Sequence, residues 1–355
     1  MKVLFLYRYG ILGGVCTQLF HRLRHLPKSS NLEIHCGFRS DHGVKAMLEG
    51  YATLHFGLNK ETTTAFLQNN NFDIIIIIDT EEYIEAVEEA DIDSKVLVEV
   101  HTSIERNLEY LTRINPDVID GFVTVSNYMV GRIKHHISDE LQDKPISIFT
   151  NVLDSDLFSN ISVDVDGPPI IGWVGKIDDH KDWRAFMQIS KIVSQEHSGA
   201  EFWIIGGQTC PENKVQEVFD FAEEMGIISR FRWIDRIENV KMSSLYSLIA
   251  KRGGLSLVTS HCESFGMSVL ESLLSGCPVV STNVGALPEI IPESSYFQLY
   301  ELADHQNGAQ KAIEIIEKSS NINQELQSIR DELITKYDSS KRSIDYWNML
   351  QEMVK

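Results

Sequence analysis

Two glutamates eight residues apart occupy the stretch of this chain with the most potential for chemistry. Glu263 precedes and Glu271 follows the start of a predicted helix over residues 267–275, shortly after an apolar run over 255–258. The first amides of such a helix lack intrahelical partners and carry the positive end of the helix dipole. At 3.6 residues per turn, Glu271 faces the same space as the helix start. We therefore expect an anion site flanked by two carboxylates, which accept hydrogen bonds from hydroxyl groups.

A glycine just before this helix also favours a ligand site. Gly266 has no side chain, so a ligand can approach the backbone closely. A molecule with a diphosphate and many hydroxyl groups, such as a sugar nucleotide, matches this site. The alternative is a helix whose acidic residues only complement its dipole. The surrounding pattern of glycines, prolines and strands favours the ligand site.

Short apolar runs alternate with longer helical segments along the chain. The runs that we predict to be strands are Val3–Tyr7, Leu32–Cys36, Ile74–Ile78, Val96–Val100, Phe122–Val125, Ile146–Phe149, Ile170–Val174, Phe202–Ile205, Phe231–Ile234, Leu255–Val258 and Val279–Ser281. Runs without polar alternation, such as 74–78, are typical of parallel strands buried on both faces. Their alternation with helices predicts an α/β fold with two doubly wound, Rossmann-like domains.

The length of 355 residues favours two domains over one. Acidic, glycine and proline residues over 159–169 break any regular pattern, so we expect the boundary there. The predicted division is residues 1–160 for the N-terminal domain, 161–335 for the C-terminal domain and 336–355 for a terminal helix. In that last segment Ile344, Trp347 and Leu350 recur at helical spacing.

The overall charge and the cysteine pattern exclude several classes of protein. A formal net charge of −19 argues against nucleic-acid binding, which needs a dense basic patch. It also leaves peripheral membrane contact unsupported. No apolar run is long enough for a transmembrane segment. The five cysteines form no C-x-x-C pair, which indicates reduced thiols and a cytoplasmic protein.

The segment from Glu263 to Glu271 resembles the E-x7-E signature of retaining glycosyltransferases of family 4, which have the GT-B fold. The match covers the C-terminal half in register and the N-terminal half more loosely. The resemblance implies a cleft between an N-terminal acceptor domain and a C-terminal nucleotide-sugar donor domain. It also implies that the terminal helix crosses back to pack on the N-terminal domain.

The resemblance further implies roles for the residues around the two glutamates. Glu263 would hydrogen-bond hydroxyls of the transferred sugar, and Glu271 would hold the ribose hydroxyls. Backbone amides at the helix start would bind the diphosphate. The residues that would supply them are Phe265, Gly266, Met267, Ser268 and Val269.

Two lysines match the family segment that opens the second domain, usually Gly-Arg-x-x-x-x-Lys-Gly. Here Lys176 and Lys181 would neutralise the diphosphate and stabilise it as it leaves. Lys176 stands where arginine is usual, which keeps the charge but loses bidentate geometry. Asp182 stands where glycine is usual, which indicates a different loop. The alternative is a solvated, charged turn.

Other positions match the family more loosely. Gly13 and Gly14 lie where the family has a glycine-rich loop against the donor phosphate and the acceptor, although a plain strand–helix turn has the same pattern. His101 follows a predicted strand at its carboxyl end, where doubly wound sheets bind ligands. In the family a histidine there lies beside the donor sugar. Gly207 and Ile237 match segments that line the nucleotide pocket.

Together these features predict a retaining, hexosyltransferase-like glycosyltransferase. It would move a sugar from a nucleotide-diphosphate donor to a glycan, lipid-linked or small-molecule acceptor, without a cofactor. Two lysines and a helix start would already supply positive charge to the diphosphate, so transfer is expected without a metal. The alternatives are a GT-B sugar-nucleotide epimerase or hydrolase, and a non-catalytic GT-B partner subunit. The donor base, the sugar and the acceptor are not encoded in a readable pattern.

Overall fold

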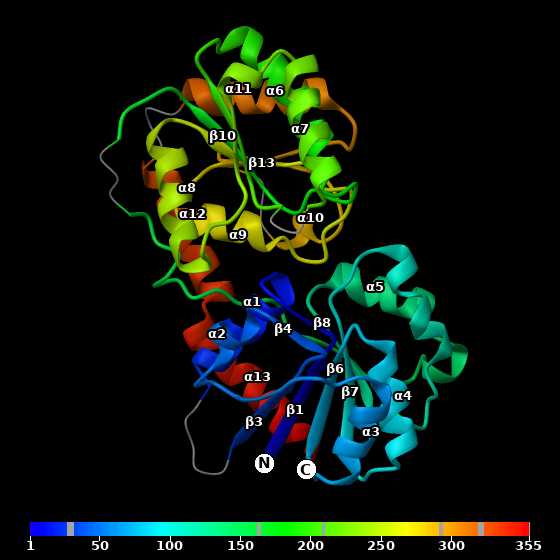
Figure 1. Cartoon of the computed structure of the whole chain (residues 1–355). Coiled ribbons are helices and arrows are strands. Elements are labelled where there is room, and N and C mark those ends of the chain that lie inside the picture. Colours follow the sequence, from blue (N-terminus) through cyan, green and yellow to red (C-terminus); the bar gives the residue numbers. More distant parts are fainter. Residues whose placement is uncertain (27–31, 162–164, 208–209, 291–293, 319–322, 355) are drawn as a thin grey trace. The chain divides into compact units, whose positions relative to one another are not determined.

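The computed structural model of this chain describes residues 1–26, 32–161, 165–207, 210–290, 294–318 and 323–354. The chain divides into two compact units (Figure 1). Unit 1 comprises residues 1–153 and 337–355, and unit 2 comprises residues 154–336. The division therefore falls somewhat before the boundary that the sequence analysis placed between residues 160 and 161. Residues 162–164 of the expected linker lie outside the described residues.

Within the described residues, unit 1 is built on a seven-stranded sheet in the order β5-β3-β1-β6-β7-β8-β9. Its neighbouring strands are all parallel. The strands are β1 Lys2–Tyr7, β3 Glu33–Gly37, β5 Thr53–His55, β6 Ile74–Ile78, β7 Lys95–Val100, β8 Gly121–Thr124 and β9 Ile146–Ile148. A separate parallel pair consists of β2 Tyr9–Ile11 and β4 Ser40–His42.

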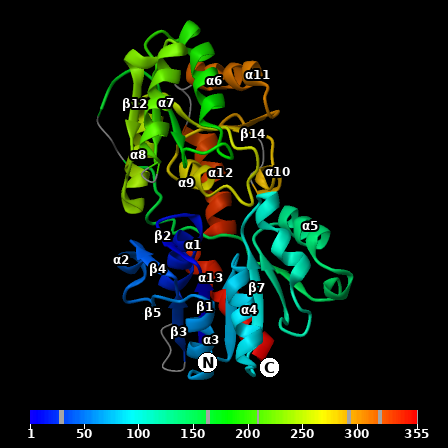
Figure 2. The same cartoon turned by 45° about the vertical axis from the view of Figure 1, so that its right-hand side comes forward.

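The helices of unit 1 cover both faces of its sheet. They are α1 Gly14–Arg24, α2 Val44–Leu48, α3 Lys60–Gln68, α4 Glu81–Ala90, α5 Asn127–His136 and α13 Ser339–Val354, with short 3₁₀ helices η1 Glu105–Asn107, η2 Glu109–Arg113 and η3 Asp139–Leu141. Helices α1, α2 and α13 share one hydrophobic core with β1 and β6. Figures 1 and 2 show α3 and α4 on the other side of the sheet.

In the part of the chain that the structure describes, the unit 2 sheet has six parallel strands in the order β12-β11-β10-β13-β14-β15. They are β10 Ile170–Val174, β11 Glu201–Ile205, β12 Phe231–Ile234, β13 Leu255–Val258, β14 Val279–Thr282 and β15 Phe297–Tyr300. The helices are α6 Trp183–Glu196, α7 Glu212–Glu224, α8 Met242–Lys251, α9 Met267–Leu274, α10 Leu287–Ile290, α11 His305–Lys318 and α12 Asn323–Tyr337, with η4 Ile228–Arg230 and η5 Asn239–Lys241.

Opposite faces of the unit 2 sheet pack against different helices. Helices α6, α7 and α11 contribute to one core with β10, β11 and β13. Helices α8 and α9 contact the sheet from the other side, where a Cβ added at Gly172 of β10 would lie 2.7 Å from Ile249 of α8. Each unit is therefore a doubly wound α/β layer structure, as the sequence predicted.

The strand β6 shows why these sheets are parallel. Its five residues are all isoleucine, and none has any exposed surface. β-branched side chains suit an extended backbone, and burial on both faces requires helices on both sides of the sheet. Connections through helices then keep successive strands parallel.

Every predicted strand overlaps a strand of the structure, but several short strands were missed. Strands β2, β4 and β5 have three residues each, and β4 is entirely polar, Ser40–His42. Such segments contain no apolar run that would identify them as strands. Their pairing depends on neighbours distant in sequence, which a local pattern does not show. The strand β15 was also missed: its Gln298 interrupts the apolar pattern of Phe297–Tyr300.

The terminal helix expected over residues 336–355 is α13, which begins at Ser339 and packs on unit 1. Tyr346, Trp347 and Leu350 are buried in the core that also contains β1. Ile344, by contrast, is 45% exposed. The apolar pattern of this helix therefore includes one residue that is not buried in the core. Among the described residues, no helix has both the length and the apolar character that a membrane span requires.

We expect Leu350→Ala to lower the free energy of unfolding of unit 1 by about 2–5 kcal/mol, because it removes buried methyl groups and leaves a cavity. The control is Ile344→Ala in the same helix, which should change it by no more than about 0.5 kcal/mol. Urea unfolding followed by circular dichroism measures both. Equal effects of the two substitutions would contradict the packing of α13 on unit 1.

Candidate functional site

The unit 2 sheet has a topological switch point between β10 and β13. These strands are neighbours in the middle of the sheet, and the chain leaves them for helices on opposite faces, α6 and α9. In doubly wound sheets the loops at the carboxyl ends of such strands diverge and leave a crevice for ligands. The loop over residues 175–182 and the loop over 259–266 therefore begin side by side.

Lys181 and Glu263, one from each loop, form an ion pair at this switch point. The Lys181 Nζ lies 2.6 Å from Glu263 Oε1, which also accepts a 2.7 Å hydrogen bond from the Ser260 hydroxyl. Burial alone would raise the pKa of Glu263, but the charge and hydrogen bond of Lys181 and the hydrogen bond of Ser260 hold it below its usual value. Glu263 is therefore an ionised carboxylate beside a cation.

Further hydrogen bonds fix the two loops to each other. The His261 amide donates to the His180 carbonyl at 2.8 Å, and the Thr259 hydroxyl lies 2.8 Å from the Lys181 carbonyl. The ring nitrogen His261 Nε2 lies 2.9 Å from Asp182 Oδ2. These bonds hold the backbone that carries Lys181 against the backbone that carries Glu263.

Asp182 also explains a departure from the usual family pattern. Its φ of 49° is left-handed, which is the conformation that favours the glycine expected at this position. Aspartate tolerates this region better than most residues. Its Oδ1 accepts a 3.0 Å hydrogen bond from the Ala185 amide, so the side chain caps α6. The substitution keeps a backbone shape suited to glycine and adds the link to His261.

Local backbone conformation and packing require a glycine at the start of α9, and close approach of a ligand there stays a prediction. Gly266 caps the helix with φ of 96°, and a Cβ there would lie 2.4 Å from Leu287 Cδ2. Phe265, Gly266 and Val269 are buried, whereas Met267 and Ser268 are partly exposed. The Val269 amide donates to the Gly266 carbonyl at 3.1 Å, so this member of the predicted set is engaged within the helix.

Glu271 lies inside α9 and is buried on the α8 side. Its Oε2 accepts a 3.3 Å hydrogen bond from the Tyr246 hydroxyl, and Asn239 also hydrogen-bonds the carboxyl group. Burial raises the pKa of Glu271 to about 7, against the smaller opposing effect of these bonds. Glu263 lies before α9 and Glu271 lies within it. Both carboxyl groups are buried, and their pKa values shift in opposite directions.

The remaining predicted residues of unit 2 follow neighbouring strands at the same edge of the sheet. Lys176 is exposed just after β10, in the loop that ends at Lys181. Gly207 follows β11 with φ of 85°, and a Cβ there would lie 2.7 Å from Ile177 Cγ1. Ile237 is half-buried in the segment after β12.

In unit 1, Gly13 and Gly14 begin α1 after the short strand β2. Gly13 is its N-cap, with an extended backbone, and its carbonyl accepts from the Thr17 amide at 2.9 Å. A Cβ at Gly14 would meet nothing within 4 Å, and one at Gly13 would lie 3.8 Å from Ile11. Side-chain crowding within unit 1 therefore does not explain either glycine.

His101 lies directly after β7 and is buried. Its amide donates to both oxygens of Asp79, each at 3.1 Å, and its Nε2 lies 2.8 Å from Glu99 Oε1. Asp79 follows the adjacent strand β6 and has a left-handed φ of 42°. Burial raises the pKa of Asp79 to about 6. His101 is therefore held at both its backbone and its ring.

Several residues that hydrogen-bond the predicted site residues were not predicted from the sequence. Glu99 could have been found, because residues two apart on a strand share a face and Glu99 precedes His101 by two. Ser260 similarly precedes Glu263 by three. Tyr246 and Asn239 left no signal, because they reach Glu271 from separate elements.

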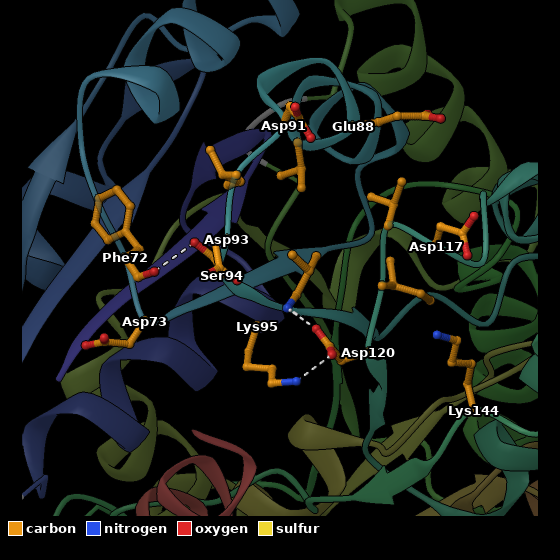
Figure 3. A pocket seen from close by; sticks show the side chains of 15 residues that line it. Phe72, Asp73, Glu88, Asp91, Asp93, Ser94, Lys95, Asp117, Asp120 and Lys144 are labelled. Carbon is orange, nitrogen blue, oxygen red and sulfur yellow. Dashed lines mark hydrogen bonds and ion pairs between the residues drawn. The ribbon is translucent and has the colours of Figure 1, made fainter. Parts of the chain in front are cut away.

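A cavity of about 570 Å³ in unit 1 lies at the amino ends of the strands, away from His101 (Figure 3). Asp73 precedes β6, Lys95 begins β7, and Asp120 precedes β8. Lys95 Nζ is 2.9 Å from Asp120 Oδ1, so its charge is already paired. Apart from Lys144, the other charged residues of the lining are acidic: Asp73, Glu88, Asp91, Asp93 and Asp117. It does not suit an anionic ligand.

Known proteins resemble this chain in sequence and in fold. The 2-deoxystreptamine N-acetyl-D-glucosaminyltransferase of Niallia circulans is 24% identical over 185 residues, which is 52% of this chain. The chain covers 46% of that relative's length. Residues 154–328, most of unit 2, match the sequence model of the family described as "Glycosyl transferases group 1".

Solved structures resemble the whole chain. That of Anabaena Alr3699/HepE in complex with UDP and glucose has a TM-score of 0.84 at 16% identity, covering 99% of this chain and 100% of its own. That of a glycosyltransferase from Rickettsia africae ESF-5 has a TM-score of 0.80 at 15% identity, covering 100% of this chain and 98% of its own. These likenesses show a shared fold, the GT-B fold with two parallel α/β domains.

We expect Gly285→Ala to disturb the loop of Glu263. A Cβ there would lie 2.1 Å from the Glu263 carbonyl oxygen, and the φ of 59° is left-handed. The matched control is Gly226→Ala, where φ is 73° and a Cβ would meet nothing. The control should cost about 1–2 kcal/mol of stability from φ alone, and Gly285→Ala about 1–3 kcal/mol more from overpacking. Equal costs in urea unfolding would show that the contact with Glu263 is unimportant.

Proposed function

Because residues 154–328 match the model of glycosyl transferases group 1, we propose that this chain transfers a sugar from a nucleoside-diphosphate sugar to an acceptor, with retention of configuration at the anomeric carbon. Within that family, the E-x7-E spacing of Glu263 and Glu271 supports assignment to family 4. The sugar nucleotide is a substrate, and the proposal includes no cofactor.

The observation that carries the proposal is the Lys181–Glu263 ion pair at the start of α9. A departing diphosphate needs positive charge, whereas sugar hydroxyls need hydrogen-bond acceptors. The pair supplies both within 2.6 Å, at the switch point of a doubly wound sheet. A structural ion pair alone would not require a helix start and a left-handed glycine at the same place.

The proposed contacts follow from the chemistry of each group. Glu263 accepts hydrogen bonds from hydroxyls of the transferred sugar, and Glu271 accepts them from the ribose. Lys181, Lys176 and the amides at the start of α9 bind the diphosphate, where helix dipole and ammonium charges act together. The larger set of donor contacts also includes Gly13, Gly14, Gly207 and Ile237, and His101 contacts the transferred sugar.

In the proposed reaction the bond between the anomeric carbon and the diphosphate oxygen breaks as the acceptor oxygen attacks from the same face. The new glycosidic bond forms there, and the acceptor proton passes to the departing phosphate oxygen. Lys176 and Lys181 stabilise the charge that develops on the diphosphate. Glu263 holds the sugar in line, and no covalent enzyme intermediate is needed.

We also propose that transfer needs no metal ion, because two lysines and a helix start already supply positive charge. Among the residues that the structure describes, no cluster of three or more histidine, cysteine or acidic side chains is arranged to hold a metal. The assay for transfer uses labelled UDP- and GDP-sugars with and without acceptors, each with and without EDTA. Strict dependence on an added divalent ion would overturn this part of the proposal.

Glu263→Ala should leave nucleoside diphosphate affinity within about twofold of wild type while transfer falls by on the order of 100-fold, because a misplaced sugar reacts slowly. Calorimetry and the labelled-donor assay measure the two quantities. A variant that melts earlier but transfers normally would reduce Glu263 to a structural partner of Lys181. Donor release without acceptor in wild type would favour a hydrolase, and binding without turnover a non-catalytic subunit.

Glu271 predicts a pH dependence of nucleotide binding. Its pKa of about 7 means that affinity for a nucleoside diphosphate should rise as pH increases through 7, because only the carboxylate accepts fully from both ribose hydroxyls. The contribution of Glu271 to folding stability has the opposite pH dependence and decreases as pH rises. The folded state retains the proton between the ordinary glutamate pKa and about 7, so stability from this group is lost as pH rises through that range.

The control is Glu271→Gln, which should bind more weakly and lose both pH dependences. Calorimetric titration measures the affinity, and thermal melts measure the stability. Both are done between pH 5 and 8.5, at about one measurement per half pH unit. If the variant retained the rise in affinity through pH 7, the ribose role of Glu271 would be wrong.

A further inference from the structure

A buried ion pair in unit 1 lies directly behind His101 and has no part in the proposed chemistry. Arg22 of α1 is 1% exposed and Glu99 of β7 is fully buried, with Arg22 Nη1 2.5 Å from Glu99 Oε1. The guanidinium also lies over the rings of Phe149 and Tyr346, at 5.0 and 4.7 Å. Buried pairs of this kind often contribute no net stability compared with apolar residues of similar size. Stability alone therefore does not account for the Arg22–Glu99 pair.

The carboxylate of Glu99 holds the ring of His101 in a defined orientation. Its Oε1 lies 2.8 Å from His101 Nε2, and a carboxylate only accepts, so Nε2 carries the hydrogen. The backbone is fixed independently, since the His101 amide donates to Asp79. With Nε2 engaged, Nδ1 is the ring atom that remains for a ligand at the carboxyl end of β7.

Arg22 keeps this anchor charged. Burial alone would raise the pKa of Glu99, but the charge of Arg22 and the hydrogen bonds from His101 and Arg22 lower it to about 2. The other oxygen, Oε2, lies 3.4 Å from the Tyr346 hydroxyl and is not used by His101. The contacts on the two oxygens can therefore be altered separately.

We infer that the Arg22–Glu99 pair is a positioning device for His101, fixing the Nε2–H tautomer so that Nδ1 faces the hydroxyls of the transferred sugar. The inference rests on the proposed function for the identity of that ligand. Glu99 and Arg22 do not touch the substrate. They act through the orientation of one imidazole ring.

The key variant is Arg22→Met with Glu99→Leu, which removes both charges and the acceptor but keeps the volume apolar. It should fold, since apolar replacement of a buried pair is generally tolerated. Its kcat should fall by on the order of 100-fold, as for a misplaced reacting group, with nucleoside diphosphate affinity unchanged. Arg22→Met with Glu99→Gln keeps a neutral acceptor for Nε2 and should recover most of the activity. Tyr346→Phe removes the hydroxyl that contacts Oε2 and Arg22 but leaves the Oε1–His101 contact, and it should leave kcat unchanged.

A spectroscopic measurement tests the anchor without any turnover. Long-range ¹H–¹⁵N correlation spectra, with the His101 signals assigned by their loss in His101→Asn, report which ring nitrogen carries the hydrogen. Wild type, Tyr346→Phe and the glutamine variant should show the Nε2–H form, and the leucine variant should lose it.

The outcomes separate the two proposals. If wild type transfers sugar and the folded leucine variant keeps wild-type kcat and the Nε2–H form, the positioning role is overturned. If tautomer and kcat change in Tyr346→Phe as much as in the leucine variant, the effect is not specific to the His101 anchor and the inference also fails. If wild type transfers no sugar from any donor, the proposed function fails, and with it the ligand assigned to Nδ1, while the spectra still decide whether Glu99 fixes the ring.

Discussion

The ionised state of the buried Glu263 depends on a cation beside it, and this requirement constrains much of unit 2. Lys181 can supply the cation only because β10 and β13 are neighbours, although their loops are about eighty residues apart in the chain. The parallel sheet brings the loops together, and the bonds of His261 and Thr259 keep them there. Without the pair, burial would favour the protonated acid, which is a poorer acceptor for hydroxyl groups.

The two units solve the same electrostatic problem in different ways. In unit 2 the lysine is partly exposed and its long side chain can exchange partners, which suits the diphosphate contact that we propose for it. In unit 1 the cation is Arg22. Its guanidinium is buried, lies over two aromatic rings and is paired with Glu99. Within the described part of the chain, Glu271 is hydrogen-bonded by Tyr246 and Asn239, neither of which is a cation, and its pKa rises instead. The two buried carboxyl groups beside a cation therefore stay ionised, whereas the third has a raised pKa.

Much of this architecture could be predicted from local sequence. Runs such as Ile74–Ile78 identify buried parallel strands, and the spacing from Glu263 to Glu271 places two acids around a helix start. Contacts between distant segments leave no comparable trace. The hydroxyl of Tyr246 reaches Glu271 from α8, and the cap formed by Asp182 depends on a left-handed φ that the sequence does not display. Short strands such as β4 depend likewise on their partners.

Unit 1 is assembled from two pieces of chain, with the whole of unit 2 inserted between them. On a ribosome, unit 2 is therefore complete before unit 1, although unit 1 is begun first. Until α13 has emerged, Tyr346 cannot cover the guanidinium of Arg22, and the core around β1 stays open to solvent. The nascent N-terminal segment thus lacks one of the helices that cover its core during the whole synthesis of unit 2, and chaperones could protect the apolar surface that α13 later buries.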